Sequence, residues 1–435
     1  MPGGRSDANA TIPERSEGRG RGRAVVPAPF TIPGFAGLWV SASTASFARI
    51  VTQVALSWIT LEATGSPFVV GVVAAARMSP QLVIGIPAGA LADWLDKRLL
   101  IAASNGLSVA LLLLTAGLAA GSLLTTPVLI GVSVLYGVLD TVRMSATQSY
   151  VYGLVRGSRA NSGMALTNFG TQLFSTIGGL AGGYALEWFG SPITFGLIAV
   201  AALVATAAPF LQSGSPEPSA RATGPASTSA DSDRPARRPG VDFGRAMTLV
   251  ARNRMLTILA LAIILAEIFG FASQTLLPTF ARDVFDVGAS GLGIMMAVRS
   301  AGGTLGLLLL SRFGAEGRSG HVFVVGAAAF GLALLLFAVS PFYALALVLL
   351  GLSGLCASIM DTLGQTLMQR NADEHERGAA MGLWVFSIGF GPVGHLTLGA
   401  AASAVGAPLA QAVSGLLLFL VAGLMALNAQ LRRAR

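Results

Sequence analysis

The sequence predicts an all-α membrane protein in which twelve transmembrane helices form two pseudo-symmetric bundles of six. Its 435 residues are 53% hydrophobic and 11% charged, with a mean hydropathy of +0.71, far from the composition of a water-soluble domain. Twelve apolar windows are each long enough to cross a bilayer, which takes about 20 residues of helix. Alternating ten-residue strands are missing from the sequence, and lipid cannot satisfy open strand edges, so the spans are expected to be helices.

The windows fall into two sets of six, separated by a polar segment. The first set is 37–61, 68–91, 99–121, 125–150, 162–186 and 191–211, and the second is 255–280, 290–312, 321–339, 341–368, 379–402 and 407–430. Residues 1–34 are predicted to be a disordered tail without a cleavable signal. Residues 212–250 are rich in Pro, Ser and charge and are predicted to be a linker. The predicted bundles are therefore 35–211 and 251–435, the second ending in a short basic tail.

The basic residues predict that both termini are cytoplasmic, because segments rich in Lys and Arg are retained on that side. Of the 28 Lys and Arg, all but five lie in the tails or in alternate loops. The formal charge of +8 is dispersed over these segments, so it indicates membrane topology and argues against nucleic-acid binding.

The two halves look like copies of one unit. Gly71 and Arg77 in the second window have the same spacing as Gly293 and Arg299 in the eighth. The fourth and tenth windows also align, from a Pro to a Gly. Repeats of this kind place transport sites at the interface between the copies.

Several loops carry a further pattern. The clearest is Gly89-x-Leu91-Ala92-Asp93-x-x-Asp96-Lys97-Arg98, and the others are Thr64-Gly-Ser-Pro67, Leu277-Pro-x-Phe-Ala-Arg282 and Glu376-Arg-Gly-Ala-Ala-Met-Gly-Leu383. With these motifs the chain resembles the major facilitator superfamily, in the branch of enterobactin-exporter-like and macrolide-efflux-like transporters. The resemblance covers everything except the tail and linker. The chain departs from it at Trp94, where a basic residue is usual, and at Gly178-Gly179, where the antiporter motif has Gly-Pro.

The resemblance implies a gating role for the loop that contains Gly89, Asp93, Asp96, Lys97 and Arg98. Gly89 would permit close helix approach, and Asp93 would face the positive end of a neighbouring helix. The two basic residues would pair with acids on the facing half and hold the outward-facing state. Alternatively, Lys97 and Arg98 serve only as topology determinants.

Charges inside the windows are costly unless they face a cavity or a partner. There are seven: Arg49, Arg77, Asp140, Arg143, Glu267, Arg299 and Asp361. The family fold surrounds its cavity with helices 1, 4, 7 and 10, flanked by 2, 5, 8 and 11, and none of the seven falls on the outer helices. Helical spacing extends four polar faces, which are Arg49 with Gln53, Asp140 with Arg143, Glu267 with Phe271 and Gln274, and Asp361 with Gln365.

Glu267 is the first candidate for proton coupling, followed by Asp361 and then Asp140. Glu267 has no basic residue one turn away on its own helix, and burial favours the uncharged form of a carboxyl group. Its alternative role is an ion pair with an arginine across the cavity. Asp140 can instead be neutralised by Arg143, three residues along the same helix.

The substrate cavity is predicted to involve polar and aromatic residues of both halves. They are Arg49, Gln53, Arg77, Arg143, Phe271, Gln274, Arg299 and Gln365. Arg77 and Arg299 occupy equivalent positions of the repeat. Either they bind an anionic substrate from both sides, or they brace helices by pairing with acids.

Motifs of ATP hydrolysis, metalloprotease and serine-hydrolase chemistry are missing from the sequence, so an enzyme, a cofactor and a metal are not expected. The only lysine is Lys97, and Cys356 is the only cysteine, so neither a P-loop nor an internal disulfide can form.

The resemblance favours a secondary active transporter, specifically a proton-coupled exporter of a small amphipathic metabolite such as a siderophore, antibiotic or drug. Two alternatives are uptake or uniport of a small organic anion, and a non-transporting membrane receptor or assembly protein. The expected partners are the lipid bilayer, a small-molecule substrate and protons, with no second chain required. The expected location is the bacterial cytoplasmic (inner) membrane.

Overall fold

The computed structural model describes residues 28–155, 160–210, 252–314, 318–373 and 376–428. The predicted linker at 212–250 and residues 1–27 of the predicted tail lie outside these ranges. Residues 28–34 belong to the predicted tail but carry structure, since Ala28–Thr31 form a 3-10 helix and the ring of Phe30 packs edge-on against Phe35 and Trp39. The tail predicted from composition is therefore too long at this end.

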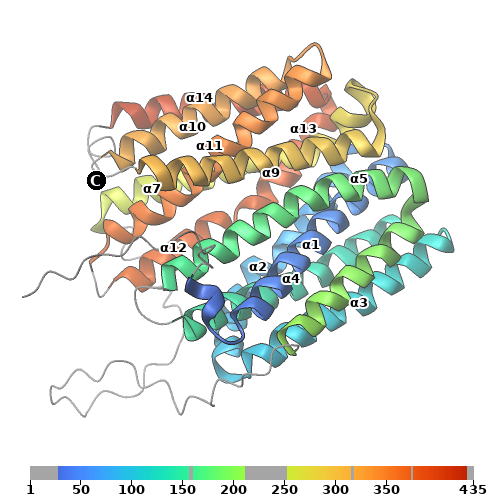
Figure 1. Cartoon of the computed structure of the whole chain (residues 1–435). Helices are drawn as coiled ribbons and strands as arrows, with labels where there is room; N and C mark the ends of the chain where they lie inside the picture. Colours follow the sequence, from blue (N-terminus) through green and yellow to red (C-terminus); the bar gives the residue numbers. More distant parts are fainter. Residues whose placement is uncertain (1–27, 156–159, 211–251, 315–317, 374–375, 429–435) are drawn as a thin grey trace, which may run out of the picture.

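The N-terminal half is built from five long helical elements. They are α1 (Phe35–Thr64), α2 (Pro67–Trp94), α3 (Lys97–Ala120), α4 (Thr126–Leu154) and α5 (Ala160–Ala207), followed by the short η3 (Ala208–Phe210). α5 turns back at Gly190, whose φ of 72° is one that residues with a Cβ rarely adopt. This turn separates the fifth and sixth crossings (Figure 1).

The C-terminal half repeats the arrangement with more interruptions. Its elements are α7 (Arg254–Phe269), η4 (Phe271–Leu276), α8 (Leu277–Thr279), the π-helix η5 (Phe280–Val284), α9 (Gly288–Phe313), α10 (Ser319–Ala338), α11 (Tyr343–Arg370), α12 (Arg377–Ile388), α13 (Gly391–Val405) and α14 (Ala407–Leu427). Figure 1 shows the two halves side by side, the first in blue to green and the second in yellow to red.

The described residues account for twelve membrane crossings. Ten stretches are long and apolar enough to cross a membrane, and one of them, Ser162–Phe210, has 49 residues and contains the turn at Gly190. α1 is more polar and is not among the ten, but its 30 residues exceed the length that a span needs. The chain is therefore a multi-pass membrane protein, and the predicted fold class is confirmed.

Two crossings of the C-terminal half are broken helices. α7 ends at Phe269 and is followed by Gly270, where a Cβ would lie 2.5 Å from a ring carbon of Phe330; the chain then continues as the 3-10 helix η4. Pro278, which has no backbone N–H, lies in the first turn of α8. The eleventh crossing is interrupted between α12 and α13, with Pro392 in the first turn of α13. Interrupted helices of this kind bring backbone and side chains into the interior of a membrane protein.

The halves touch along two pairs of helices, α2 with α13 and α5 with α9. Gly71 of α2 lies against the carbonyl of His395, where a Cβ would overlap. Gly293 of α9 lies against α5, and a Cβ there would be 2.5 Å from the carbonyl oxygen of Gly179. Because Gly71 and Gly293 are the equivalent glycines of the repeat, the two crossing points correspond to each other.

The hydrogen bonds between the described residues of the two halves lie at one end of the bundle and near its middle. We call the end where α1 begins and α14 finishes the terminal end, and the other the opposite end (Figure 1). Three hydrogen bonds join the halves at the opposite end: Phe68 N to Ser403 Oγ (3.0 Å), Ser290 N to Glu187 Oε2 (2.8 Å) and Arg282 Nη1 to the Leu61 carbonyl (2.8 Å). The remaining side-chain hydrogen bonds between described residues of the two halves lie near the middle. The described residues therefore close the halves against each other at the opposite end.

Candidate functional site

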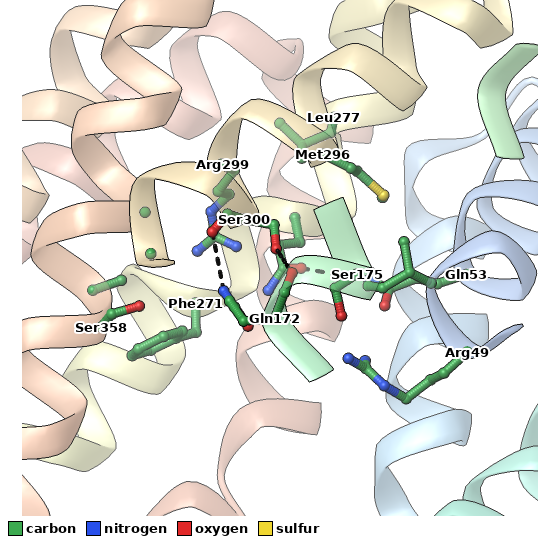
Figure 2. Close-up of a pocket in the computed structure, with 15 residues that line it drawn as sticks. Arg49, Gln53, Gln172, Ser175, Phe271, Leu277, Met296, Arg299, Ser300 and Ser358 are labelled. Atoms are coloured by element: carbon green, nitrogen blue, oxygen red, sulfur yellow. Dashed lines mark hydrogen bonds between the residues drawn. The ribbon is translucent and has the colours of Figure 1, made fainter. Parts of the chain in front are cut away.

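A cavity of about 250 Å³ lies between the two halves (Figure 2). α1 and α5 form one wall, and η4, α8, α9 and α11 form the other. Its lining residues are Arg49, Ile50, Gln53, Gln172, Ser175, Phe271, Gln274, Leu277, Met296, Arg299, Ser300, Gly303, Gly354, Ala357 and Ser358. The volume is just below the roughly 300–1,000 Å³ of most small-molecule sites. The cavity therefore suits a small ligand in this conformation.

Amide side chains bridge the cavity from one half to the other. Gln172 Nε2 donates to the carbonyl of Ser300 at 3.1 Å, and Ser300 Oγ donates to the carbonyl of Gln172 at 3.3 Å. Gln53 Nε2 lies 3.4 Å from Gln274 Oε1, a long hydrogen bond. These bonds hold the walls together while leaving amide groups available to a ligand.

A cluster of charges lies behind the N-terminal wall. Asp140 of α4 accepts from Arg143 Nη2 at its Oδ1 (2.8 Å) and from Arg77 Nη2 at its Oδ2 (2.9 Å). Arg77 Nη2 also lies 3.4 Å from the carbonyl of Arg49. Asp140 thus ties α2 to α4, and Arg77 takes the bracing arrangement that the sequence left as one of two alternatives.

The charges of the C-terminal half are not paired in this way. Among the described residues, Glu267, Arg299 and Asp361 make no ion pair within 4.0 Å. Arg299 and Asp361 nevertheless act on Glu267 electrostatically. Glu267 is 8% exposed, and a Cβ at Gly391 of α13 would be 3.4 Å from its Oε2. Glu267 is therefore a buried carboxyl group beside the junction of α7 and α13.

Five of the residues predicted for the substrate cavity line it: Arg49, Gln53, Phe271, Gln274 and Arg299. Arg77 and Arg143 are not among the lining residues, because both are engaged with Asp140. Gln365 is also not among them, and α11 instead contributes Gly354, Ala357 and Ser358, which lie about two to three turns earlier.

The polar face predicted to run from Glu267 through Phe271 to Gln274 is wrong. That face assumed a continuous helix, whereas α7 ends at Phe269 and the chain changes to the 3-10 helix η4 after Gly270. Phe271 and Gln274 consequently face the cavity while Glu267 is not a lining residue.

Polar residues of α5 and α9 were missed by the sequence analysis. Gln172 and Ser175 share one face of α5, and Ser300 follows Arg299 directly. The spacing of Gln172 and Ser175, three residues apart in an apolar window, is a signal that could have identified them.

The loop predicted to gate the molecule lies at the terminal end. Asp96 caps α3, since its Oδ1 accepts from the backbone N–H groups of Arg98 (2.8 Å) and Leu99 (3.2 Å). Gly89 and Asp93 lie in the last turns of α2. Among the described residues, Lys97 and Arg98 form no ion pair with the facing half. The gating role of the loop stays a prediction.

Metal binding has no support in the parts of the chain that the structure describes, where no group of three His, Cys, Asp or Glu side chains could hold an ion.

Comparisons with known proteins agree with this architecture. A curated relative, the staphyloferrin A transporter of Staphylococcus aureus (strain NCTC 8325 / PS 47), is 24% identical over 364 residues, which cover 82% of this chain and 86% of the relative. The fold is similar to that of the nucleoside transporter NupG, with a TM-score of 0.68 and 14% identity, over 90% of this chain and 98% of that one. It is also similar to a bacterial homologue of the human lysosomal transporter Spinster, solved in an inward-facing and unoccupied conformation. That comparison has a TM-score of 0.66 and 13% identity over 92% and 97% of the two chains.

The family assignment rests on a match that spans nearly the whole chain. Residues 25–435 match the model of a family described as transmembrane secretion effector. This match, the twelve crossings and the transporter folds lead to one conclusion. The chain belongs to the transmembrane secretion effector family of major facilitator transporters.

Proposed function

We propose that this protein is a proton-coupled exporter that moves a small amphipathic metabolite, such as a siderophore or an antibiotic, by alternating access. The curated relative supports siderophore-like cargo, because its name assigns it staphyloferrin A. The cargo would occupy the cavity between the halves. The protein would act as a single chain in the bacterial cytoplasmic membrane. No nucleic acid or cofactor is part of the proposal.

The orientation predicted from the basic residues makes the terminal end cytoplasmic. The contacts at the opposite end would then close the cavity from the outside, which corresponds to an inward-facing state. Cargo would enter from the cytoplasm, and rocking of the halves would expose it to the outside.

The observation that carries the coupling is the environment of Glu267. A buried carboxylate is costly unless it is paired or protonated, and among the described residues Glu267 has no basic partner within 4.0 Å. Asp140, by contrast, is held by two arginines and is poorly suited to release and take up a proton. We therefore place the proton on Glu267, with Asp361 as the second candidate.

Proton flux in inverted membrane vesicles tests this proposal. A pH-sensitive dye would report loss of the gradient while a panel of siderophores and antibiotics is added to wild type, Glu267→Gln and Glu62→Gln. Glu62 is an exposed carboxyl near the end of α1 and is the matched control. We expect one compound to dissipate the gradient in wild type and in Glu62→Gln but not in Glu267→Gln.

Two other outcomes would contradict parts of the proposal. Dissipation in Glu267→Gln at the wild-type rate would move the proton to another group, and Asp361→Asn is the next variant to measure. If no compound dissipates the gradient although the protein is folded, the result would contradict the proposal of a proton-coupled exporter.

A further inference from the structure

We infer that the cavity binds a molecule with two anionic groups, one held by Arg49 and the other by Arg299. The inference rests on the proposed function, since it treats the cavity as the cargo site. It adds the chemical class of the cargo, a small dicarboxylate or bisphosphate. Figure 2 shows the two arginines on different walls, with Gln172 and Ser175 between them in the view.

Arg49 belongs to a cluster with an excess of positive charge. Both carboxylate oxygens of Asp140 accept from other guanidinium groups, those of Arg77 and Arg143. Arg49 itself has no ion pair among the described residues, although the charges of the cluster act on it. Its side chain lines the cavity, where an anion could compensate it.

Arg299 is the unpaired charge of the other wall, although Glu267 acts on it electrostatically. Its Nε is buried and has no hydrogen-bond partner in the described structure, and no carboxylate lies within 4.0 Å. A guanidinium group in a membrane interior is costly without a counter-ion. No Asp or Glu occurs among the lining residues, so the described wall supplies none.

The repeat explains why Arg77 has an ion pair while Arg299 has none among the described residues. Gly137 of α4 crosses against the carbonyl of Arg77, and Gly354 of α11 crosses against the carbonyl of Arg299. The structure thus pairs Gly137 with Gly354, whereas the alignment expected from the sequence paired it with Gly351. Three residues beyond Gly137 is Asp140, and three residues beyond Gly354 is Ala357, a lining residue. The C-terminal half thus has an alanine where the N-terminal half has the acid that neutralises its arginine.

A guanidinium group suits carboxylate and phosphate alike, because its N–H groups form a planar fork that matches two oxygens. Gln53, Gln172 and Gln274 add amide groups along the path between the arginines. A ligand with an anionic group at each end would contact both halves at once. It would therefore be bound best when both walls face it.

The test is binding to the purified full-length protein, measured by isothermal titration calorimetry. One arm uses linear dicarboxylates of increasing length, each paired with its monoamide, and the other uses linear alkane bisphosphates with their monophosphates. In wild type we expect an optimum length at which the dianion binds about 10- to 100-fold more tightly than its monoanion, as charged hydrogen bonds predict. The arm that shows this preference identifies the anionic group.

Variants of the two arginines test whether each one binds an anionic group. Arg49→Gln and Arg299→Gln should each abolish the preference for the dianion. Arg312→Gln should retain it, because Arg312 is exposed in the last turn of α9 and is not a lining residue. Ala357→Asp should also abolish the preference with Arg299 still present, because the new carboxylate would take the role of Asp140. Ala357→Asn adds nearly the same bulk without the charge, so it should reduce the preference less than Ala357→Asp does, and this difference isolates the effect of the charge.

Equal binding of dianion and monoanion in wild type, or no binding in either arm, would overturn the inference. Retention of the preference in both Arg49→Gln and Arg299→Gln would do the same. Proton flux driven by a neutral or cationic compound would support the exporter proposal and contradict the inference that the cargo is a dianion. Dianion binding without proton flux would support the inference that the cavity binds a dianion and contradict the proposal of proton coupling.

Discussion

Asp140 holds two helices together because each of its carboxylate oxygens accepts from a different arginine. Removing this charge would leave two guanidinium groups, with side chains only 15% and 10% exposed, without their counter-ion. We expect Asp140→Asn to lower the free energy of unfolding by about 3 kcal/mol, the cost of breaking a buried pair. Thermal unfolding in detergent would measure it.

The control for this prediction is the exposed pair of Arg282 and Asp283. Asp283 is 43% exposed at its side chain, and such pairs contribute about 0–1 kcal/mol. Asp283→Asn should therefore have little effect. An equal loss of stability in both variants would mean that Asp140 does not brace the bundle.

Neutralising Glu267 should affect the free energy of unfolding much less than neutralising Asp140. Because it makes no ion pair among the described residues, Glu267→Gln breaks none, and we expect the free energy of unfolding to stay within about 1 kcal/mol of wild type. The same unfolding measurement checks this. A loss comparable to that of Asp140→Asn would indicate that Glu267 is a structural residue and would weaken its role in coupling.

At the scale of the elements, α5 shows how one helix serves two neighbours. Gly178 and Gly182 lie against Phe47 and Val51 of α1, within the same half. Gly179 and Gly183 lie one residue further on, against α9 of the other half. One face of α5 thus packs against α1 within the same half, and the adjacent face packs against α9 of the other half.

We expect Gly293→Ala to weaken the contact between α5 and α9. Its Cβ would lie 2.5 Å from the Gly179 carbonyl oxygen and 2.7 Å from the Gly183 Cα, and overpacking of this kind costs about 1–3 kcal/mol. The opposite end should open more often, raising the labelling rate of a cysteine placed at Ala289, which is 4% exposed and lies against Gly183 of α5. Gly196→Ala, where a Cβ would meet nothing within 4 Å, is the control and should leave labelling unchanged.

The sequence predicted these elements well wherever a helix is continuous. Arg49 and Gln53 line the cavity together because α1 has no break between them. The glycines of α5 also keep their helical spacing, so that Gly178 and Gly182 meet one neighbour and Gly179 and Gly183 the other. The seventh span was predicted correctly, but its polar face was not, because Gly270 interrupts the helix between Glu267 and Phe271. Spacing alone cannot show where a helix ends.

Pairing between helices is the part that spacing could not resolve. Arg77 and Arg299 occupy equivalent positions, so their different surroundings are invisible along their own helices. The difference comes from Asp140 on α4 and Ala357 on α11, which only the fold brings next to them. Predicting which arginine has an ion pair therefore required knowing how the helices cross.

For the molecule as a whole, the two halves are closed at the opposite end by matching contacts of the repeat. Gly71 lies against α13 and Gly293 against α5, so each half contributes one of the two crossing glycines. Alternating access requires that both contacts separate as a unit. A covalent bond across either one should therefore stop transport.

A disulfide across α2 and α13 tests that requirement. The backbone N–H of Phe68 donates to Ser403 Oγ at 3.0 Å, a proximity that favours a bridge between cysteines at these two positions. In a background carrying Cys356→Ala, which removes the only native cysteine, we expect Phe68→Cys/Ser403→Cys to lose substrate-driven proton flux on oxidation and to regain it on reduction.

A disulfide within one half distinguishes locking from damage. Ser41 Oγ donates to the carbonyl of Ala205 at 2.6 Å, and both residues belong to the N-terminal half. Ser41→Cys/Ala205→Cys should keep proton flux when oxidised, because a half that moves as a rigid body is unaffected by an internal bridge. Full flux through the oxidised Phe68/Ser403 pair would show that cargo crosses without separating α2 from α13, and the rocking of two rigid halves would have to be abandoned.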